Sequence, residues 1–264
     1  MIPHMVLGDF AKGGFAELKL VELGDRRRAI LRKPLGFSIF RLGEYNRFKR
    51  GIAIRAQVSP HKNIVNSIDY GYDFLHPWEI IEYVNGDNLK THYNNRSAGL
   101  TTNREYILES CASGIAWVHS SGYMHLDVKP ENFICQAGDK LVVKLTDFDL
   151  ARPEDDNGPN IQMGTPNYMA PEQFHGKHSY KASDVFAFSI MAYMFFTGKM
   201  PFKGTTQRAA LKRQASENYE APYVKESVPE VSSKWNAAIA KGLAKKVENR
   251  FPDMTAMLDF IRSR

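Results

Sequence analysis

The chain is poor in cysteine, with two in 264 residues, Cys111 and Cys135. Two thiols give neither a disulfide framework nor a metal-binding spacing, so the sequence excludes a small disulfide-stabilised scaffold. Free cysteine usually packs as a small buried hydrophobe, and we expect both residues in the core. The lack of a disulfide framework also favours a reducing compartment, and we therefore expect a cytoplasmic protein.

Long apolar runs are missing as well. No stretch approaches the roughly 20 consecutive apolar residues that a membrane-spanning helix needs. The first residues of the chain also lack the pattern of a secretion signal. The most apolar stretch, residues 185–196, is apolar on all sides, which predicts a buried helix rather than a membrane span.

Charge of one sign is in only modest excess, since 35 Lys and Arg against 29 Asp and Glu give a net charge of +6. The densest basic cluster is Arg26, Arg27 and Arg28, and no aromatic side chains alternate with it to stack on bases. This favours a solvated hairpin over a surface for nucleic acid or acidic lipid, so we expect no nucleic-acid partner. The length suffices for two lobes with separate cores or for one large domain.

Polar side chains of three kinds gather at residues 125–132, which read HLDVKPEN. Asp127 can accept the proton of an incoming hydroxyl, Lys129 can neutralise a transferring phosphoryl group, and Asn132 can hold a metal ion. A second carboxylate, Asp147, would hold another metal ion on the phosphates of a nucleotide. The alternative is a structural loop, in which Asp127 caps a turn and Asn132 begins a helix. Phosphoryl transfer depends mostly on positioning and charge neutralisation, so these residue types favour a phosphotransferase.

These residues resemble the catalytic loop and the metal-binding segment of the eukaryotic-type protein kinases. A second stretch, residues 164–172, reads GTPNYMAPE and resembles the substrate-docking segment of the same family. The resemblance implies that Thr165 hydrogen-bonds near Asp127 and Lys129, a feature of serine/threonine-directed members.

The resemblance covers nearly the whole chain and implies the α+β, bilobal protein-kinase fold, with a small antiparallel β lobe carrying one helix and a larger, mainly α-helical lobe. Asp184 would tie down the backbone of the catalytic loop, and Glu172 would form a buried pair with Arg250. We expect one kinase domain, whose parts would be the small lobe (1–84), the large lobe (85–264), the catalytic loop (125–132) and the activation segment (147–172).

The nucleotide site that the resemblance implies begins with a degenerate glycine-rich loop. The family pattern GxGxxG allows the backbone to close over the phosphates without side chains in the way. Here the three places read Ala11, Gly13 and Ala16. The middle glycine is kept, so we expect nucleotide binding to be weakened but not excluded.

The strand that follows is where the family carries a phosphate-binding lysine. Period-two alternation counted from Leu18 places Arg32 at that position, with Lys33 as the alternative. Leu18 and Ile30 would then cover the adenine. Arginine binds phosphate oxygens as a fork, but it is bulkier than lysine and does not simply replace it.

Residues 79–86, EIIEYVNG, resemble the last strand of the small lobe and the hinge after it. The resemblance makes Ile81 the gatekeeper and turns the carbonyl of Glu82 and the backbone N–H and C=O of Val84 toward the adenine edge. Asn88 falls where a ribose-contacting side chain is common. An ordinary strand that leads to a glycine turn would predict the same sequence.

Several positions depart from the family pattern. The helix glutamate that pairs with the strand lysine falls at Gly51, and Glu44 lies about two turns upstream. Leu126 replaces the arginine that reads a phosphorylated activation loop in many kinases, and Asp149 replaces a glycine. Residues 150–164 contain no serine, threonine or tyrosine, so a phosphate within that stretch cannot switch the protein on.

The sequence therefore predicts ATP-dependent phosphoryl transfer to Ser/Thr hydroxyls of protein substrates, with ATP and Mg²⁺ as cofactors and Mn²⁺ as a substitute ion. We expect no activation by phosphorylation of the activation segment. The alternative is a pseudokinase, a nucleotide-binding or scaffold module for a partner protein, and Ala11, Ala16, Arg32 and Gly51 favour it. A small-molecule phosphotransferase is a third interpretation. The sequence makes no prediction of the oligomeric state.

Overall fold

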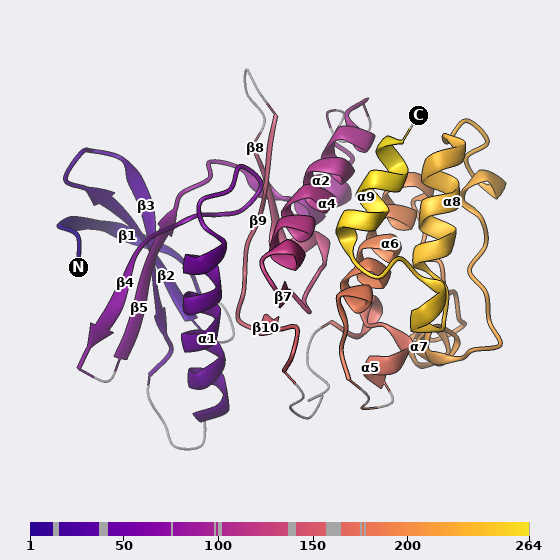
Figure 1. Ribbon diagram of the computed structural model, residues 1–264. Coiled ribbons are helices and arrows are strands. Elements are labelled where there is room, and N and C mark those ends of the chain that lie inside the picture. Colours follow the sequence, from indigo (N-terminus) through magenta and orange to yellow (C-terminus); the bar gives the residue numbers. More distant parts are fainter. Residues whose placement is uncertain are drawn as a thin grey trace.

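The computed structural model describes residues 1–12, 16–36, 42–74, 76–97, 99, 102–136, 141–156, 165–174, 176 and 178–263. An antiparallel sheet with one long helix beside it forms the first part of the chain, and a larger, mainly helical part follows (Figure 1). This arrangement is the α+β, bilobal kinase fold that the sequence predicts.

The first part holds a five-stranded sheet in the order β1-β2-β3-β5-β4, with all neighbours antiparallel. Its elements are β1 (His4–Lys12), β2 (Ala16–Leu23), β3 (Arg28–Pro34), α1 (Leu42–Val58), β4 (Ser67–Asp73) and β5 (His76–Glu82). The basic cluster lies at the tight turn between β2 and β3, where Arg26 has a left-handed φ of 66° and Arg27 pairs with Asp25. The predicted hairpin is therefore present.

The second part is built mainly from helices. Its elements are β6 (Asp87–Asn88), α2 (Leu89–Asn94), α4 (Arg104–Ser120), β7 (Tyr123–Met124), η2 (Pro130–Asn132), β8 (Phe133–Gln136), β9 (Val142–Leu145), β10 (Arg152–Pro153), η3 (Pro166–Tyr168), α5 (Pro171–Phe174), α6 (Lys181–Thr197), α7 (Gln207–Ala215), η4 (Val224–Glu226), α8 (Ser233–Gly242), η5 (Val247–Asn249) and α9 (Met254–Arg262). None of the helices in the described ranges is both long and apolar enough to cross a lipid bilayer.

Helix α6 is the centre of the large core. Residues 182–196 are all buried, which confirms the predicted buried helix, and α4, α8 and α9 pack around it. Full burial of a phenylalanine such as Phe186 or Phe188 contributes about 1.5–3 kcal/mol. The helix ends at Thr197 and is capped by Gly198, whose left-handed φ of 70° allows its N–H to bond the carbonyl of Met194.

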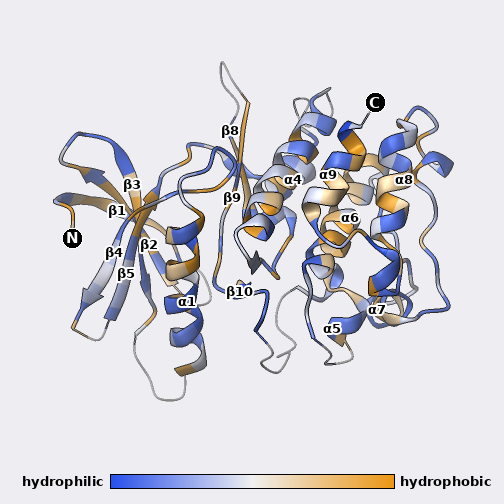
Figure 2. Ribbon diagram, in the orientation of Figure 1, coloured by the Kyte–Doolittle hydropathy of each residue, from blue (hydrophilic) through white to orange (hydrophobic). Residues whose placement is uncertain are grey.

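Helix α1 is amphipathic, and its colour changes between hydrophilic and hydrophobic turns (Figure 2). Phe48 and Ile52 lie one turn apart on its buried side and pack with Ala16 of β2. The same buried side carries Gly51 and Arg55. The helix begins at Leu42, and residues 37–41 before it lie outside the described residues.

Candidate active site

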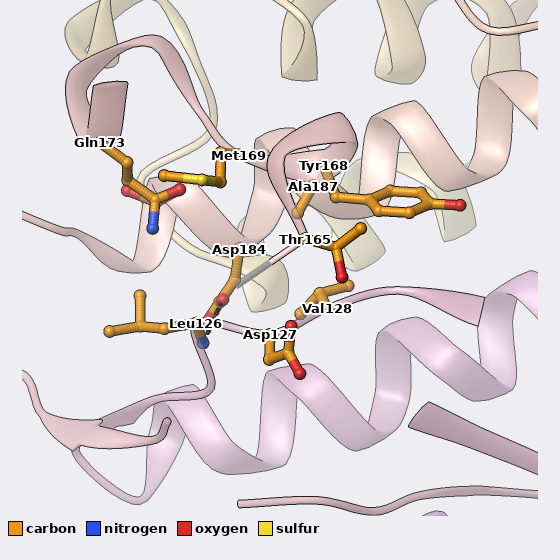
Figure 3. A pocket seen from close by; sticks show the side chains of 10 residues that line it. Leu126, Asp127, Val128, Thr165, Tyr168, Met169, Gln173, Asp184 and Ala187 are labelled. Carbon is orange, nitrogen blue, oxygen red and sulfur yellow. Dashed lines mark hydrogen bonds between the residues drawn. The ribbon is translucent and has the colours of Figure 1, made fainter. Parts of the chain in front are cut away.

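The catalytic loop is fixed to α6 by one carboxylate. Asp184 accepts the N–H of His125 at 2.7 Å and the N–H of Leu126 at 2.8 Å, and its carboxylate faces that backbone (Figure 3). His119 of α4 lies 3.0 Å from the same carboxylate. Leu126 has a φ of 61°, a strained conformation for a residue other than glycine. The predicted role of Asp184 is confirmed, since its two bonds hold the backbone in this conformation.

Asp127 lies at the centre of a polar cluster. Its Oδ2 accepts a hydrogen bond from Lys129 Nζ at 2.7 Å and another from Asn132 Nδ2 at 2.8 Å. The 3-10 helix η2, which begins at Pro130, turns the chain back so that Asn132 reaches Asp127. Asp127 and Asn132 are 8% and 5% exposed, so these groups meet in a mostly dry site. The three residues that the sequence singles out in this loop are therefore in contact.

Asp147 lies beside this cluster because β8 and β9 pair. The N–H of Thr146 donates to the carbonyl of Asn132 at 2.9 Å, so the next residue, Asp147, emerges next to the catalytic loop. Its φ of 61° is a second strained position. Asp147 supplies a carboxylate and Asn132 an amide oxygen, and Mg²⁺ is usually held by one or two such groups together with substrate phosphates. The donor set thus fits a divalent cation bound with a nucleotide.

His125 joins the catalytic loop to the metal-binding segment. Its Nε2 lies 3.1 Å from the carbonyl oxygen of Thr146, and its ring meets Phe148 edge-on at 5.1 Å between centroids. Burial lowers the pKa of this imidazole, although the carboxylates of Asp127 and Asp147, among others, oppose the shift. A neutral His125 therefore serves as packing and as a backbone anchor.

Thr165 lies opposite the catalytic loop at the start of η3. It lines the same small pocket as Asp127 and Val128, and the close view places its side chain over that loop (Figure 3). The segment is held by Gln214, whose side-chain amide donates to the carbonyls of Pro166 and Met169. Thr165 and Asp127 thus face one site from two separate segments.

Apolar side chains expected around the adenine form one cluster. Ile30 of β3 and Ile81 of β5 are opposite each other in the sheet and pack with Val65, and Leu18 and Val84 lie against them. They come from β2, β3, the segment before β4, β5 and the connection after β5, so the fold assembles an apolar wall that the sequence leaves scattered. Such walls are typical of nucleotide pockets.

The phosphate-covering loop is described in part. Ala11 is exposed in β1 opposite Leu18, and Ala16 is buried at the start of β2 against Phe48. Gly13 lies outside the described residues.

The hinge is held by a local network. The Glu82 side chain accepts hydrogen bonds from Lys144 Nζ at 2.8 Å and from the backbone N–H of Asn66 at 3.2 Å. The carbonyl of Val84 accepts the N–H of Gly86 at 3.0 Å. A Cβ at Gly86 would lie 2.4 Å from the carbonyl oxygen of Cys135, so the backbone approaches β8 more closely than any side chain would allow.

Asn88 is the N-cap of α2. Its Oδ1 accepts the N–H of Thr91 at 2.9 Å, a common way to satisfy the first turn of a helix. A contact with a ribose stays a prediction for this residue.

Arg32, rather than Lys33, is the buried cation of β3. Lys33 reaches outward to pair with the exposed Asp73 at 3.0 Å, while Arg32 is 6% exposed. The register of β2 and β3 places Arg32 opposite Leu18, as the alternation predicts. Its Nη1 donates to Glu79, and its Nη2 donates to Asp149 Oδ2 at 3.0 Å. Burial alone lowers the pKa of Arg32, and the carboxylates of Asp149 and Glu79 more than reverse that effect.

Gly51 lies where α1 meets residues 147–149, the stretch that resembles the metal-binding segment of the family and is called by that name below. A Cβ at this position would lie 2.9 Å from Asp149 Oδ1 and 2.9 Å from the carbonyl oxygen of Phe148, closer than real contacts allow. Glu44, the other candidate partner of the strand cation, lies in the first turn of the helix. Arg32 pairs instead with Glu79 and Asp149.

The sequence analysis does not identify two members of this buried network, Glu79 and Arg55. Glu79 of β5 is fully buried and receives both Arg32 and Arg55, whose Nε lies 3.2 Å from Glu79 Oε2. Arg55 also lies over the ring of Phe148, 5.0 Å from its centroid. The available signal is one acidic residue in the apolar run Trp78–Ile81, together with an arginine on the helix face of Ile52, because a buried charge needs a partner.

The large lobe contains a second buried ion pair. Arg250 donates to both carboxylate oxygens of Glu172, at 2.9 and 2.8 Å, and Ser183 Oγ adds a bond at 2.6 Å. This confirms the predicted pair and fixes the segment after Thr165 to the start of α6. A bidentate arginine of this kind has strict geometry.

Comparison with known proteins identifies the family. A family profile described as "Protein kinase domain" matches residues 11–259. The chain is 28% identical to a probable serine/threonine-protein kinase PknB of Lactococcus lactis over 261 residues, which are 97% of this chain and 41% of the relative. It is 30% identical to the serine/threonine-protein kinase PrkC of Bacillus subtilis over 254 residues, 94% of the chain and 38% of the relative.

A third relative, the serine/threonine-protein kinase pkn2 of Myxococcus xanthus, is 31% identical over 221 residues, 80% of this chain and 26% of the relative. The chain spans about two fifths or less of the length of these relatives. The profile and the geometry of the site agree, and the chain belongs to the protein kinase family.

Proposed function

We propose that this chain transfers the γ-phosphoryl group of ATP to Ser/Thr hydroxyls of protein substrates, as one kinase domain over residues 1–264 with lobes at 1–84 and 85–264. The observation that carries the proposal is the contact of Lys129 and Asn132 with a single oxygen of Asp127. Catalysis of phosphoryl transfer needs a base, a cation and metal-holding groups held in place beforehand.

Each residue of the cluster has one role in this proposal. Because both hydrogen bonds end on Oδ2 of Asp127, its Oδ1 is the oxygen that would accept the proton of the substrate hydroxyl. Lys129 would neutralise the transferring phosphoryl group, and Thr165 would hold the substrate segment near both residues. Asn132 and Asp147 would hold Mg²⁺ or Mn²⁺, and the bound ions supply charge neutralisation on the phosphates.

The nucleotide would lie between the lobes. Leu18, Ile30 and Ile81 would cover the adenine, and the backbone of Glu82 and Val84 would read its edge. The glycine-rich loop, with Ala11, Gly13 and Ala16, would close over the phosphates, and Asn88 would approach the ribose. Arg32 would contact the phosphates, because a guanidinium has five N–H donors and two carboxylates use only part of them.

We further propose that the activation segment is set without phosphorylation. Its start is fixed by Arg50 of α1, whose Nε donates to the carbonyl of Ala151 at 2.8 Å, and by the pair of Lys181 with Glu154. Residues 150–164 contain no hydroxyl side chain, and residues 157–164 lie outside the described residues. Peptide mapping by mass spectrometry tests this, and a stoichiometric phosphate in residues 147–172 that raises activity would refute it.

A radiolabelled-phosphate assay tests the proposed activity. The purified chain is incubated with labelled ATP and a mixture of Ser- and Thr-containing peptides, with Mg²⁺ or Mn²⁺, beside an Asp127→Ala variant. We expect label in the peptides with the unmodified chain and none with the variant. Equal label with both proteins would mean contamination by another kinase. No label with either protein would refute the proposed enzyme activity.

The scaffold interpretation is favoured by one observation, which is that Arg32 is held by two carboxylates. Thermal unfolding with and without ATP and Mg²⁺ separates the two functions. A ligand that binds only the folded state raises the melting temperature, so stabilisation without transfer would favour a nucleotide-binding pseudokinase.

A further inference from the structure

The space that a helix glutamate fills in the family pattern is occupied here by Asp149. Only glycine fits at position 51, since a Cβ there would lie 2.9 Å from Asp149 Oδ1 and 2.9 Å from the carbonyl oxygen of Phe148. The other oxygen of the same carboxylate receives Arg32 Nη2 at 3.0 Å. A side chain at position 51 would therefore press against the backbone of Phe148 and against the Asp149 side chain that contacts Arg32.

The buried charges balance only when one of positions 51 and 149, and not both, carries a carboxylate. Arg32 and Arg55 contribute two positive charges, and Glu79 and Asp149 contribute two negative charges. A glutamate at position 51 together with Asp149 would leave one negative charge in excess, and glycine at both positions would leave one positive charge in excess. An unbalanced buried charge is costly, so the residues at positions 51 and 149 depend on each other.

We propose that Asp149 is a positioning residue for Arg32 and supplies, from the metal-binding segment, the carboxylate that the family pattern places at position 51 of the helix. The proposal rests on the proposed function, because Arg32 is positioned for the phosphates of ATP. It deepens that function by making the phosphate-binding cation depend on the segment that carries Asp147.

The ion pair between α1 and the sheet also has its charges reversed relative to the family pattern. The helix contributes a cation, Arg55, and the sheet contributes the anion, Glu79 of β5. Arg55 also covers the ring of Phe148, so α1 contacts the metal-binding segment through Gly51 and through Arg55. Arg32 is therefore positioned by β5 and by the metal-binding segment. Helix α1 contacts both of them through Arg55.

An exchange of residues between the two positions tests this inference. The variants are Asp149→Gly, Gly51→Glu and the double variant, with Gly43→Glu as a control that adds the same acid to an exposed turn of α1. Kinetics with varied ATP and varied peptide are compared. We expect KM for ATP to rise about tenfold in each single variant, while KM for the peptide stays unchanged.

The double variant decides the matter. We expect its KM for ATP to return to within about threefold of the unmodified chain. Its melting temperature should exceed that of Gly51→Glu, because the contact with the Asp149 side chain is relieved while the contact with the Phe148 backbone stays. A double variant no better than the worse single variant would overturn the inference. Asp149→Asn, which keeps shape and removes charge, serves if Asp149→Gly does not fold, and an unchanged KM for ATP in that variant would overturn it as well.

Failure of the proposed function would look different. If the unmodified chain transfers no phosphate, the enzyme proposal fails, and the melting temperatures of the four proteins with and without ATP still test the exchange. ATP-induced stabilisation that is lost in both single variants and recovered in the double variant would support the role of Asp149 toward Arg32. Its absence in the double variant, with stabilisation present in the unmodified chain, would refute that role.

Discussion

The catalytic loop differs from the buried network of Arg32, Arg55, Glu79 and Asp149 in how far it keeps the family pattern. In the loop, Asp127, Lys129 and Asn132 keep the expected residue types, and Lys129 and Asn132 both hydrogen-bond Asp127. In the network, the helix glutamate has become Gly51 and the carboxylate beside the strand cation comes from Asp149. Groups that touch the reacting atoms admit few substitutes, whereas a supporting charge can come from any element that reaches the same place.

The largest effect is expected in the catalytic loop. Asp127→Asn removes the proton acceptor and keeps the shape of the side chain, so kcat should fall about a thousandfold, with KM for ATP little changed. Initial rates of phosphate transfer measure this, and circular dichroism confirms the fold. Retention of more than about a tenth of kcat would show that Asp127 is not the base.

The next largest effect concerns the buried pair of the large lobe. Glu172→Gln leaves Arg250 buried without its carboxylate, so the free energy of unfolding should fall by about 3–5 kcal/mol. The control is Glu109→Gln, which breaks the partly exposed pair with Arg262 and should cost less than about 1 kcal/mol. Urea unfolding compares the two variants. Equal losses would mean that burial of the pair does not decide its contribution.

A smaller effect should follow in the network of the small lobe. Arg55→Met removes one of two cations from Glu79, which keeps its bond to Arg32. We expect the free energy of unfolding to fall by about 1–3 kcal/mol, less than for Glu172→Gln. Arg28→Met, at an exposed end of β3, is the matched control. An effect of Arg55→Met no larger than that of the control would mean that α1 is held mainly by apolar contacts.

The smallest effect is expected at the outward-facing cation of β3. Lys33→Met breaks only the outward pair with Asp73, so the free energy of unfolding should change by less than about 0.5 kcal/mol and KM for ATP should stay within about twofold. Arg32→Met, one residue away, should raise KM for ATP by at least tenfold. Reversed results would assign the phosphate-binding role to Lys33.

Features that depend on residues close together in the sequence could be predicted from it. Alternation along β3 places Arg32 inward, and the all-apolar run of α6 predicts its burial. The residues of the catalytic loop lie within six positions, so their contact follows from one turn of chain. Glu172 and Arg250 are far apart in sequence, and only the family resemblance predicts that pair.

The buried network around Arg32 could not be predicted in the same way. Its charges come from β3, α1, β5 and the segment after β9, and no local periodicity relates these elements. Gly51 by itself indicates a missing carboxylate, and Asp149 by itself indicates an added one. That the two changes compensate becomes visible only when the space beside Arg32 is known.

The most direct test of the central claim is a crystal structure of the chain with a non-hydrolysable ATP analogue and Mn²⁺, with the ions located by anomalous scattering. We predict manganese at Asn132 Oδ1 and at the carboxylate of Asp147, a phosphate oxygen beside Arg32, and Oδ1 of Asp127 open toward the γ-phosphate. A nucleotide bound with its metal ions away from Asn132 and Asp147 would contradict the account.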